Sequence, residues 1–259
     1  MAVERILAPN PGLMTGPGTN TWLVDDGGEV AVIDPGPRSE EHGDAIRAAV
    51  AGFRPVAVLV THAHPDHAPA ANSLAEEFGV PAVGFGDGPD FAADRTVTDG
   101  DEIVVGDRSL LVVETPGHTP DSICFRLGDD LFTGDHVMGG STVVVEDMGA
   151  YMASLERLVG TGLRRLYPGH GPVIDQPEEV LATYLAHRLD RDQQIVRALH
   201  GGATSVDEIV AMVYQDVDPA LHPVAAVSVA AHLRALVADG RADAAVLDGY
   251  SSPLPEDFS

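Results

Sequence analysis

The chain has 259 residues, which is enough to bury a full core as one large domain or one domain with an appendage. It contains no run of about 20 apolar residues and no basic segment leading into an apolar one near its start, which argues against a membrane span and a secretory signal. Its 40 acidic residues face only 15 basic ones, all arginine, and the formal charge of −25 disfavours polyanionic partners such as duplex DNA. We therefore expect a cytoplasmic protein. The acidity fits either adaptation to high salt or a GC-rich genome.

The first predicted elements alternate strands with helices. Short apolar and β-branched runs predict strands at residues 19–24, 30–34 and 56–60. The first two strands are separated by Asp25-Asp26-Gly27-Gly28, a hairpin signal. Capping residues and helical periodicity predict helices at 39–51, 68–78 and 150–159. Strands that feed helices in this way indicate a layered α/β sandwich.

A dense group of metal-ligand residues follows the strand at 56–60. In the run from Thr61 to His67, the pattern H-x-H-x-D-H places three imidazoles and one carboxylate within six positions. The spacing sends His62 and His64 one way and Asp66 and His67 another. These are more ligands than one tetrahedral ion needs, so the run predicts two adjacent metals. The alternative, a His-rich turn that only caps the next helix, requires four ligands to cluster by chance.

Three more candidate ligands each stand in a turn after a short strand. They are His118 in Thr115-Pro116-Gly117-His118, Asp135 in Thr133-Gly134-Asp135, and His170 in Tyr167-Pro168-Gly169-His170. Ends of strands are places where a rigid scaffold can hold several ligands around one point.

With these motifs in this order, the chain resembles the metallo-β-lactamase-fold hydrolases. The resemblance implies one metal held by His62, His64 and His118, a second held by Asp66, His67 and His170, and Asp135 bridging the two. Many β-lactamases of this fold have Cys where this chain has Asp135, so the chain is more similar to the glyoxalase-like and ribonuclease-like branches. The implied fold is a four-layer αββα sandwich with the metals at one edge.

The sequence changes character at residue 177. Apolar residues at helical spacing, the glycine pair Gly201-Gly202 and a capping box that starts at Ser205 predict three helices, and residues 244–247 look like a strand. This pattern resembles a winged-helix module. We therefore expect a metal-hydrolase domain at 1–176, a winged-helix-like subdomain at 177–250 and a disordered tail at 251–259. The last 83 residues hold five arginines against 13 acids, so a structural lid or a dimer surface is favoured over DNA binding.

Flanking motifs suggest a branch of the superfamily. Asn10-Pro11-Gly12, the run from Gly18 to Val24 and Tyr184-Leu185-Ala186-His187-Arg188 resemble the β-lactamase-like protein 2 family, which includes endoribonucleases that act on single-stranded RNA. The predicted function is hydrolysis of a small ester or thioester by a metal-bridging hydroxide, in the manner of glyoxalase II. Single-stranded RNA cleavage and a non-catalytic metal-binding role are the alternatives, and a homodimer is possible.

The expected cofactors are two divalent metal ions, with Zn²⁺ as the default and Fe or Mn²⁺ as chemically reasonable alternatives. Asp66 is the candidate to accept a proton from the attacking water. His187 is the candidate leaving-group acid, although an exposed histidine on an amphipathic helix is an equally good interpretation. The single cysteine, Cys124, lies in a strand-like run and is expected to be buried and inert.

Overall fold

The computed structural model describes residues 2–140 and 143–251. Its contacts divide the chain into two units. The first comprises Met1–Thr115, Asp121–Thr142 and Gly162–Pro177, and the second comprises Pro116–Pro120, Val143–Thr161 and Glu178–Ser259. The predicted domain limits at 176 and 250 remain predictions, and the predicted tail falls, apart from Ser251, outside the described residues.

One six-stranded sheet forms the first half of the first unit, in the spatial order β1-β2-β3-β4-β5-β6. The hairpin between β2 and β3 is confirmed, because the two strands pair antiparallel across Gly27 and Gly28, both of which have positive φ. From β3 to β6 the pairs are parallel, so these strands end at the same edge of the sheet. The strands are β1 (Ala2–Leu7), β2 (Asn20–Asp26), β3 (Glu29–Ile33), β4 (Arg54–Leu59), β5 (Ala82–Gly84) and β6 (Arg95–Thr96).

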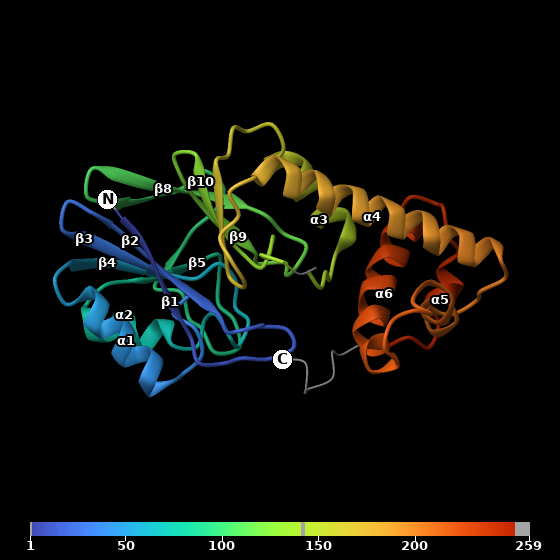
Figure 1. The fold of residues 1–259 in the computed structure, drawn as a ribbon, viewed down its shortest axis with the longest axis horizontal. Helices are drawn as coiled ribbons and strands as arrows, with labels where there is room; N and C mark the ends of the chain where they lie inside the picture. The colour runs from blue at the N-terminus through green and yellow to red at the C-terminus, as the bar shows by residue number, and fades with distance from the viewer. Residues whose placement is uncertain (1, 141–142, 252–259) are drawn as a thin grey trace. The chain divides into compact units, whose positions relative to one another are not determined.

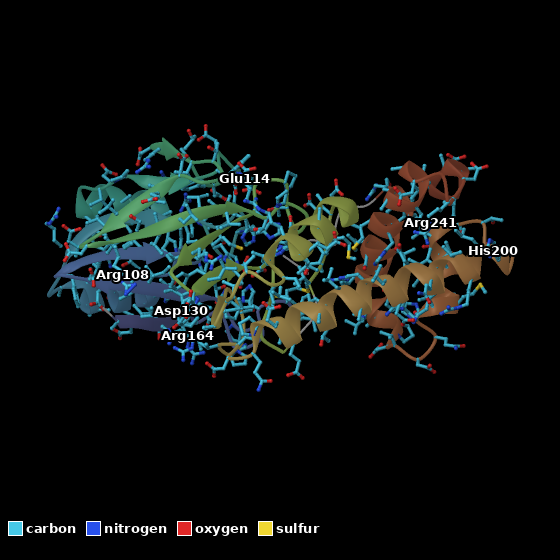
Figure 2. The ribbon with its side chains drawn as sticks, turned by 90° about the horizontal axis from the view of Figure 1, so that it is seen from above. Arg108, Glu114, Asp130, Arg164, His200 and Arg241 are labelled. Atoms are coloured by element: carbon cyan, nitrogen blue, oxygen red, sulfur yellow. The ribbon has the colours of Figure 1, made fainter. Side chains whose placement is uncertain are left out.

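A second sheet of five strands has the order β11-β10-β9-β8-β7. Its pairs are antiparallel except for β10 and β11, which run in the same direction and end together. Asp130 at the start of β10 lies beside Arg164, with 3.4 Å between the carboxylate and the guanidinium (Figure 2). The strands are β7 (Glu102–Val105), β8 (Arg108–Glu114), β9 (Ile123–Leu127), β10 (Asp130–Gly134) and β11 (Arg165–Pro168).

Strands β2, β3 and β5 of the first sheet are buried on both faces, and each face of the sheet has its own core. Trp22 and Ile33 belong to the cluster that also contains Phe125 and Phe132 of the second sheet. The intervening Leu23, Val32 and their neighbours pack instead against helices α1 (Glu40–Val50) and α2 (Ala71–Phe78), which cover that side of β1–β5 (Figure 1). Such two-sided burial is typical of parallel strands that are covered by helices. Two sheets with helices outside confirm the predicted α/β sandwich class of fold.

The second unit is helical. Its elements are α3 (Met148–Leu158), α4 (Pro177–His200), α5 (Val206–Val213), η1 (Pro219–Leu221), α6 (His222–Ala238) and η2 (Ala244–Leu247). The predicted end of α4 before Gly201-Gly202 is confirmed, and the Ser205 side chain caps α5 by accepting a hydrogen bond from the amide of Glu208.

Helix α6 is apolar on all sides because it is the central helix of this unit. The segment Pro219–Ala238 has a mean hydropathy of 1.4 over 18 residues and is long enough, by length and composition, to span a membrane. Half of that window is nevertheless buried within the protein, where Val229 and Leu233 belong to a core shared with α4 and α5. A core helix of this kind passes the same test of length and composition.

The predicted strand at 244–247 is wrong, because the structure forms the short 3₁₀ helix η2 there. The Asp243 side chain accepts a hydrogen bond from the amide of Ala245, which starts the helical turn. Val246 alone is fully buried in this segment. The four-residue apolar run is too short to distinguish the two conformations by its pattern, and in the described part of the second unit it has no strand to pair with.

The buried position of Cys124 is confirmed, and it leads to a first prediction. Its side chain is fully buried on β9, and burial raises the pKa of the thiol to about 12, against the lowering effect of the hydrogen bond with Thr115. We expect no reaction of the native protein with a disulfide reagent at about pH 8, and one thiol per chain after unfolding in denaturant. Rapid labelling of the native protein would contradict the assigned burial.

Candidate metal centre

The H-x-H-x-D-H run forms the connection between β4 and α2. The strand ends at Leu59, and the chain turns so that the amides of His67 and Ala68 both donate to the carbonyl oxygen of His64. His62 and His67 are buried, while His64 and Asp66 remain partly accessible. The run therefore stands at the edge of the first sheet where its parallel strands end.

Asp135 and His170 come from the second sheet. Asp135 directly follows β10, and His170 follows β11 after one residue. Because β10 and β11 are parallel neighbours, their carboxyl ends bring the two side chains to one edge, where the amide of Gly169 also donates to the carbonyl oxygen of Gly134 at 2.8 Å. The site is thus assembled from the ends of strands in both sheets.

Four of these side chains converge on one point. The Nε2 atoms of His67 and His170 are 3.2 Å apart. Asp66 Oδ2 lies 3.5 Å from His67 Nε2 and 3.0 Å from His170 Nε2. Asp135 reaches the same two nitrogens with different oxygens, at 3.3 Å through Oδ1 and 3.4 Å through Oδ2. Two imidazoles and two carboxylates that face one another at these distances form a donor set suited to a divalent cation.

Five of the seven predicted ligands, all in the first unit, form two groups of this kind. Within each group the ligand atoms lie within 4.8 Å of one another, and the groups are His62, His67 and Asp135; and Asp66, His67 and His170. His67 is shared by both groups, and Asp135 joins the one that contains His62 and His67. His118 lies in the second unit, so its predicted place beside His62 and His64 remains a prediction.

The histidines are oriented by bonds to their other ring nitrogen. Nδ1 of His67 lies 2.9 Å from Asp34 Oδ2, Nδ1 of His62 lies 3.0 Å from Thr61 Oγ1, and Nδ1 of His118 lies 2.7 Å from the carbonyl oxygen of Val144. His170 makes a longer contact of 3.4 Å with the carbonyl oxygen of Gly18. A proton on Nδ1 leaves Nε2 as the ligand atom, which is the arrangement found around metal-binding histidines.

Asp34 is the main residue that the sequence reasoning missed. It was interpreted only as the end of a strand, yet its buried carboxylate accepts hydrogen bonds from the amide and hydroxyl of Thr61, both at 2.8 Å, as well as binding His67. Its φ of 50° is unusual for a residue other than glycine. The sequence did offer one signal for Asp34, which is its position. Like the predicted ligands, it is a polar residue in a turn at the end of a strand.

The carboxylates of Asp66 and Asp135 make positive charge favourable within the cluster. Burial alone would lower the pKa of His170, but Asp135 and Asp66 outweigh it and raise the pKa to about 9. Burial likewise would raise the pKa of Asp66, but His67 and His170 bring it down to about 2. The carboxylates thus stay ionised and attract protons onto the imidazoles. A bound divalent cation would supply the same positive charge in place of those protons.

Two positions next to the cluster are glycines, where a larger residue would clash with its side chains. A Cβ atom at Gly169 would lie 2.5 Å from Cε1 of His67 and 2.6 Å from Oδ1 of Asp135. At Gly134 it would lie 2.4 Å from the Thr61 hydroxyl, and the φ there is +48°. The set of donor atoms and the space that the two glycines leave beside it both fit a bound metal.

His187 is placed on the exposed side of α4 in the second unit. Partial desolvation and the neighbouring Arg188 and Arg191 lower the pKa of its imidazole, which favours the neutral form. Its role as a leaving-group acid remains a prediction.

Comparisons with known proteins identify the two parts of the chain. Residues 14–170 match the family model described as the metallo-beta-lactamase superfamily, and residues 205–246 match the beta-lactamase associated winged helix domain. The second match agrees with the predicted winged-helix-like region, although the described residues form no β-hairpin there.

Two relatives and one solved structure show how far the likeness extends. The beta-lactamase-like protein 2 homolog of Caenorhabditis elegans is 34% identical, over 92% of this chain and 85% of the relative. The atrochrysone carboxyl ACP thioesterase nsrC of Aspergillus novofumigatus is 33% identical, over 83% of this chain and 71% of the relative. A beta-lactamase domain protein from Burkholderia ambifaria, 23% identical, has the same fold with a TM-score of 0.79, over 92% of this chain and 86% of that one.

Proposed function

The chain belongs to the metallo-beta-lactamase superfamily of hydrolases, which bind divalent metal ions, and we propose that it hydrolyses a small ester or thioester at a dinuclear metal centre. The observation that carries this proposal is the convergence of Asp66, His67, Asp135 and His170 on one point. His62, His64 and His118 would hold the first metal, Asp66, His67 and His170 the second, with Asp135 between them. Zn²⁺ is the metal we expect, with Fe or Mn²⁺ as alternatives.

The bound cations would supply Lewis acidity and lower the pKa of a water molecule at the site. Asp66 is the proposed residue to orient that water and accept its proton, because its carboxylate is the partly accessible one of the pair with Asp135. Thr19 Oγ1 donates to Asp66 Oδ2 at 3.3 Å and so limits the rotation of this carboxylate. Nδ1 of His67 remains engaged with Asp34, which keeps Nε2 directed to the site throughout.

Thioesters are favoured among the substrates by the relatives and by the apolar surface near the site. Several relatives, including nsrC, are named as ACP thioesterases. In this chain Leu13 is 67% exposed on a loop that Asn10 and Thr19 close, and Phe85 is 39% exposed directly after β5. β5 is the parallel neighbour of β4, so Phe85 lies at the same sheet edge as the metal loop. Both side chains offer apolar contact to an acyl group.

A substrate panel tests the proposal. Protein loaded with Zn²⁺, Mn²⁺ or Fe²⁺ would be offered an acyl N-acetylcysteamine thioester, S-lactoylglutathione, an aryl ester and a short single-stranded RNA. We expect metal-dependent hydrolysis of a thioester or ester, its loss on chelation, and its absence from the Asp135→Asn variant prepared in parallel.

Cleavage of the RNA alone, absent from the same variant, would replace the thioesterase assignment by the nuclease alternative, which the charge of −25 opposes. If protein with both metals bound hydrolyses no substrate of the panel, the non-catalytic role is favoured. A homodimer and a cytoplasmic location remain predictions.

A further inference from the structure

Asn20, the first residue of β2, is fully buried and holds the loop that carries His170. Its Nδ2 donates to the carbonyl oxygens of Pro168 and Gly171, both at 2.9 Å. Its backbone amide donates to the carbonyl oxygen of Gly169 at 2.7 Å. One residue therefore binds this four-residue loop at three carbonyl groups, on both sides of His170.

Besides Asn20, two backbone hydrogen bonds hold the loop, from the amide of Gly169 to the carbonyl oxygen of Gly134 and from the amide of Gly139 to the carbonyl oxygen of His170. Apart from His170 it consists of Pro168, Gly169 and Gly171, so it has no polar side chain to anchor it. Glycine is required at 171, where φ is +80° and a Cβ would lie 2.0 Å from the carbonyl oxygen of Gly139. Because the loop is free of anchoring side chains, its place must be set from outside.

The amide of Asn20 is oriented for this purpose. Both neighbours of Nδ2 are carbonyl oxygens, so the NH₂ group must face the loop. Oδ1 is then buried without a hydrogen-bond partner in the described residues. A buried amide with one unsatisfied atom is unfavourable for folding alone. Its two donors, directed to the His170 loop, account for its presence.

Residues next to Asn20 in the chain contact the other parts of the centre. Thr19 Oγ1 donates to Asp66, and Thr21 Oγ1 donates to the carbonyl oxygen of Asp34 at 2.6 Å. Trp22 Nε1 shares the carbonyl oxygen of Pro168 with Asn20, at 3.0 Å. The chain from Thr19 to Trp22 thus contacts three segments of the centre, and Asn20 makes the largest share of its hydrogen bonds to the His170 loop.

We infer that Asn20 is a positioning residue for the second metal, which it places through His170. The inference rests on the proposed dinuclear centre. It assigns a role to a residue that touches neither metal nor substrate and acts only through the backbone that surrounds one ligand. Loss of the two donors leaves His170 present but displaced, so the second metal position weakens while the first is retained.

The test is metal binding by Asn20→Asp, which keeps the shape of the side chain and replaces both donors by an acceptor. We expect wild type to bind two equivalents of Mn²⁺ and the variant to bind the first normally, with the second weakened about 10–100-fold. Electron paramagnetic resonance should show a coupled Mn²⁺ pair in wild type and isolated ions in the variant. Asp130→Asn, a buried polar change at the opposite end of β10, controls for a general loss of stability.

Each outcome decides one point. An Asn20→Asp protein that is less stable than wild type but binds both equivalents with unchanged affinity overturns the inference and leaves the dinuclear centre standing. A wild type that never binds more than one equivalent overturns both. If Asn20→Asp does not fold, Asn20→Ser retains one short donor, and we expect the same selective loss of the second equivalent in milder form.

Discussion

Asp135→Asn is expected to lower kcat/KM by about 10³-fold, which corresponds to ~4 kcal/mol of lost transition-state stabilisation. The carboxylate faces His67 through one oxygen and His170 through the other, so it contacts both imidazoles of the convergent cluster. Asparagine keeps the shape but removes the negative charge and replaces one acceptor by a donor. We expect metal content to fall from two equivalents to one or fewer, measured by elemental analysis of protein dialysed against dilute metal.

Asp130→Asn is the matched control, because it makes the same chemical change in a buried carboxylate of β10, the strand that Asp135 directly follows. Asp130 is paired with Arg164 and stands at the far end of β10 from Asp135. We expect a small loss of thermal stability with full metal content and activity. Equal activity and metal content in the two variants would show that Asp135 is not a metal ligand.

Gly169→Ala is expected to abolish the second metal position and reduce activity by about 100-fold or more, since displacements near 1 Å are enough for such losses. The added methyl group would stand 2.5 Å from His67 and 2.6 Å from Asp135, distances that both side chains must relieve by moving. Metal stoichiometry and kcat should fall together. The fold should survive, because the two shortest contacts are with side chains at the edge of the sheets and the backbone contact, with Gly134, is longer at 3.1 Å. Circular dichroism will check this.

Gly52→Ala is the control for Gly169→Ala, because it makes the same substitution at a glycine where the added methyl group has free space. Its Cβ would meet nothing within 4 Å, and its φ is not in the left-handed region. We expect wild-type activity and metal content from it. Retention of two tightly bound metals by Gly169→Ala would mean that the space beside Gly169 is not the metal position.

The parts that the sequence predicted correctly are those with local patterns. The hairpin at Gly27-Gly28, the helix capped by Ser39 and the buried Cys124 each follow from residues next to one another in the chain. The predicted ligand run from His62 to His67 is a local pattern of the same kind. His118, Asp135 and His170 were predicted as ligands because each repeats one local theme, a polar side chain in a turn after a strand.

What the sequence did not reveal depends on pairs that are far apart in the chain. Asp34 contacts His67 across 33 positions, and Asn20 contacts Pro168 across 148. Both were assigned only to local strand structure, and nothing in their own neighbourhoods indicates the distant partner. The error at Ala244–Leu247 has another cause, because four apolar residues fit a strand and a single helical turn equally well, and Asp243 decided between them.

The proposed ligands of the second metal follow strands of two different sheets. Asp66 and His67 follow β4, whereas Asp135 and His170 follow β10 and β11. A cation held by all four would therefore cross-link the two sheets at the edge that they share. Since that edge exists only after the sheets have packed, such an ion would bind the native state and not the unfolded chain, and the stability of the packed sheets would then increase with the metal concentration.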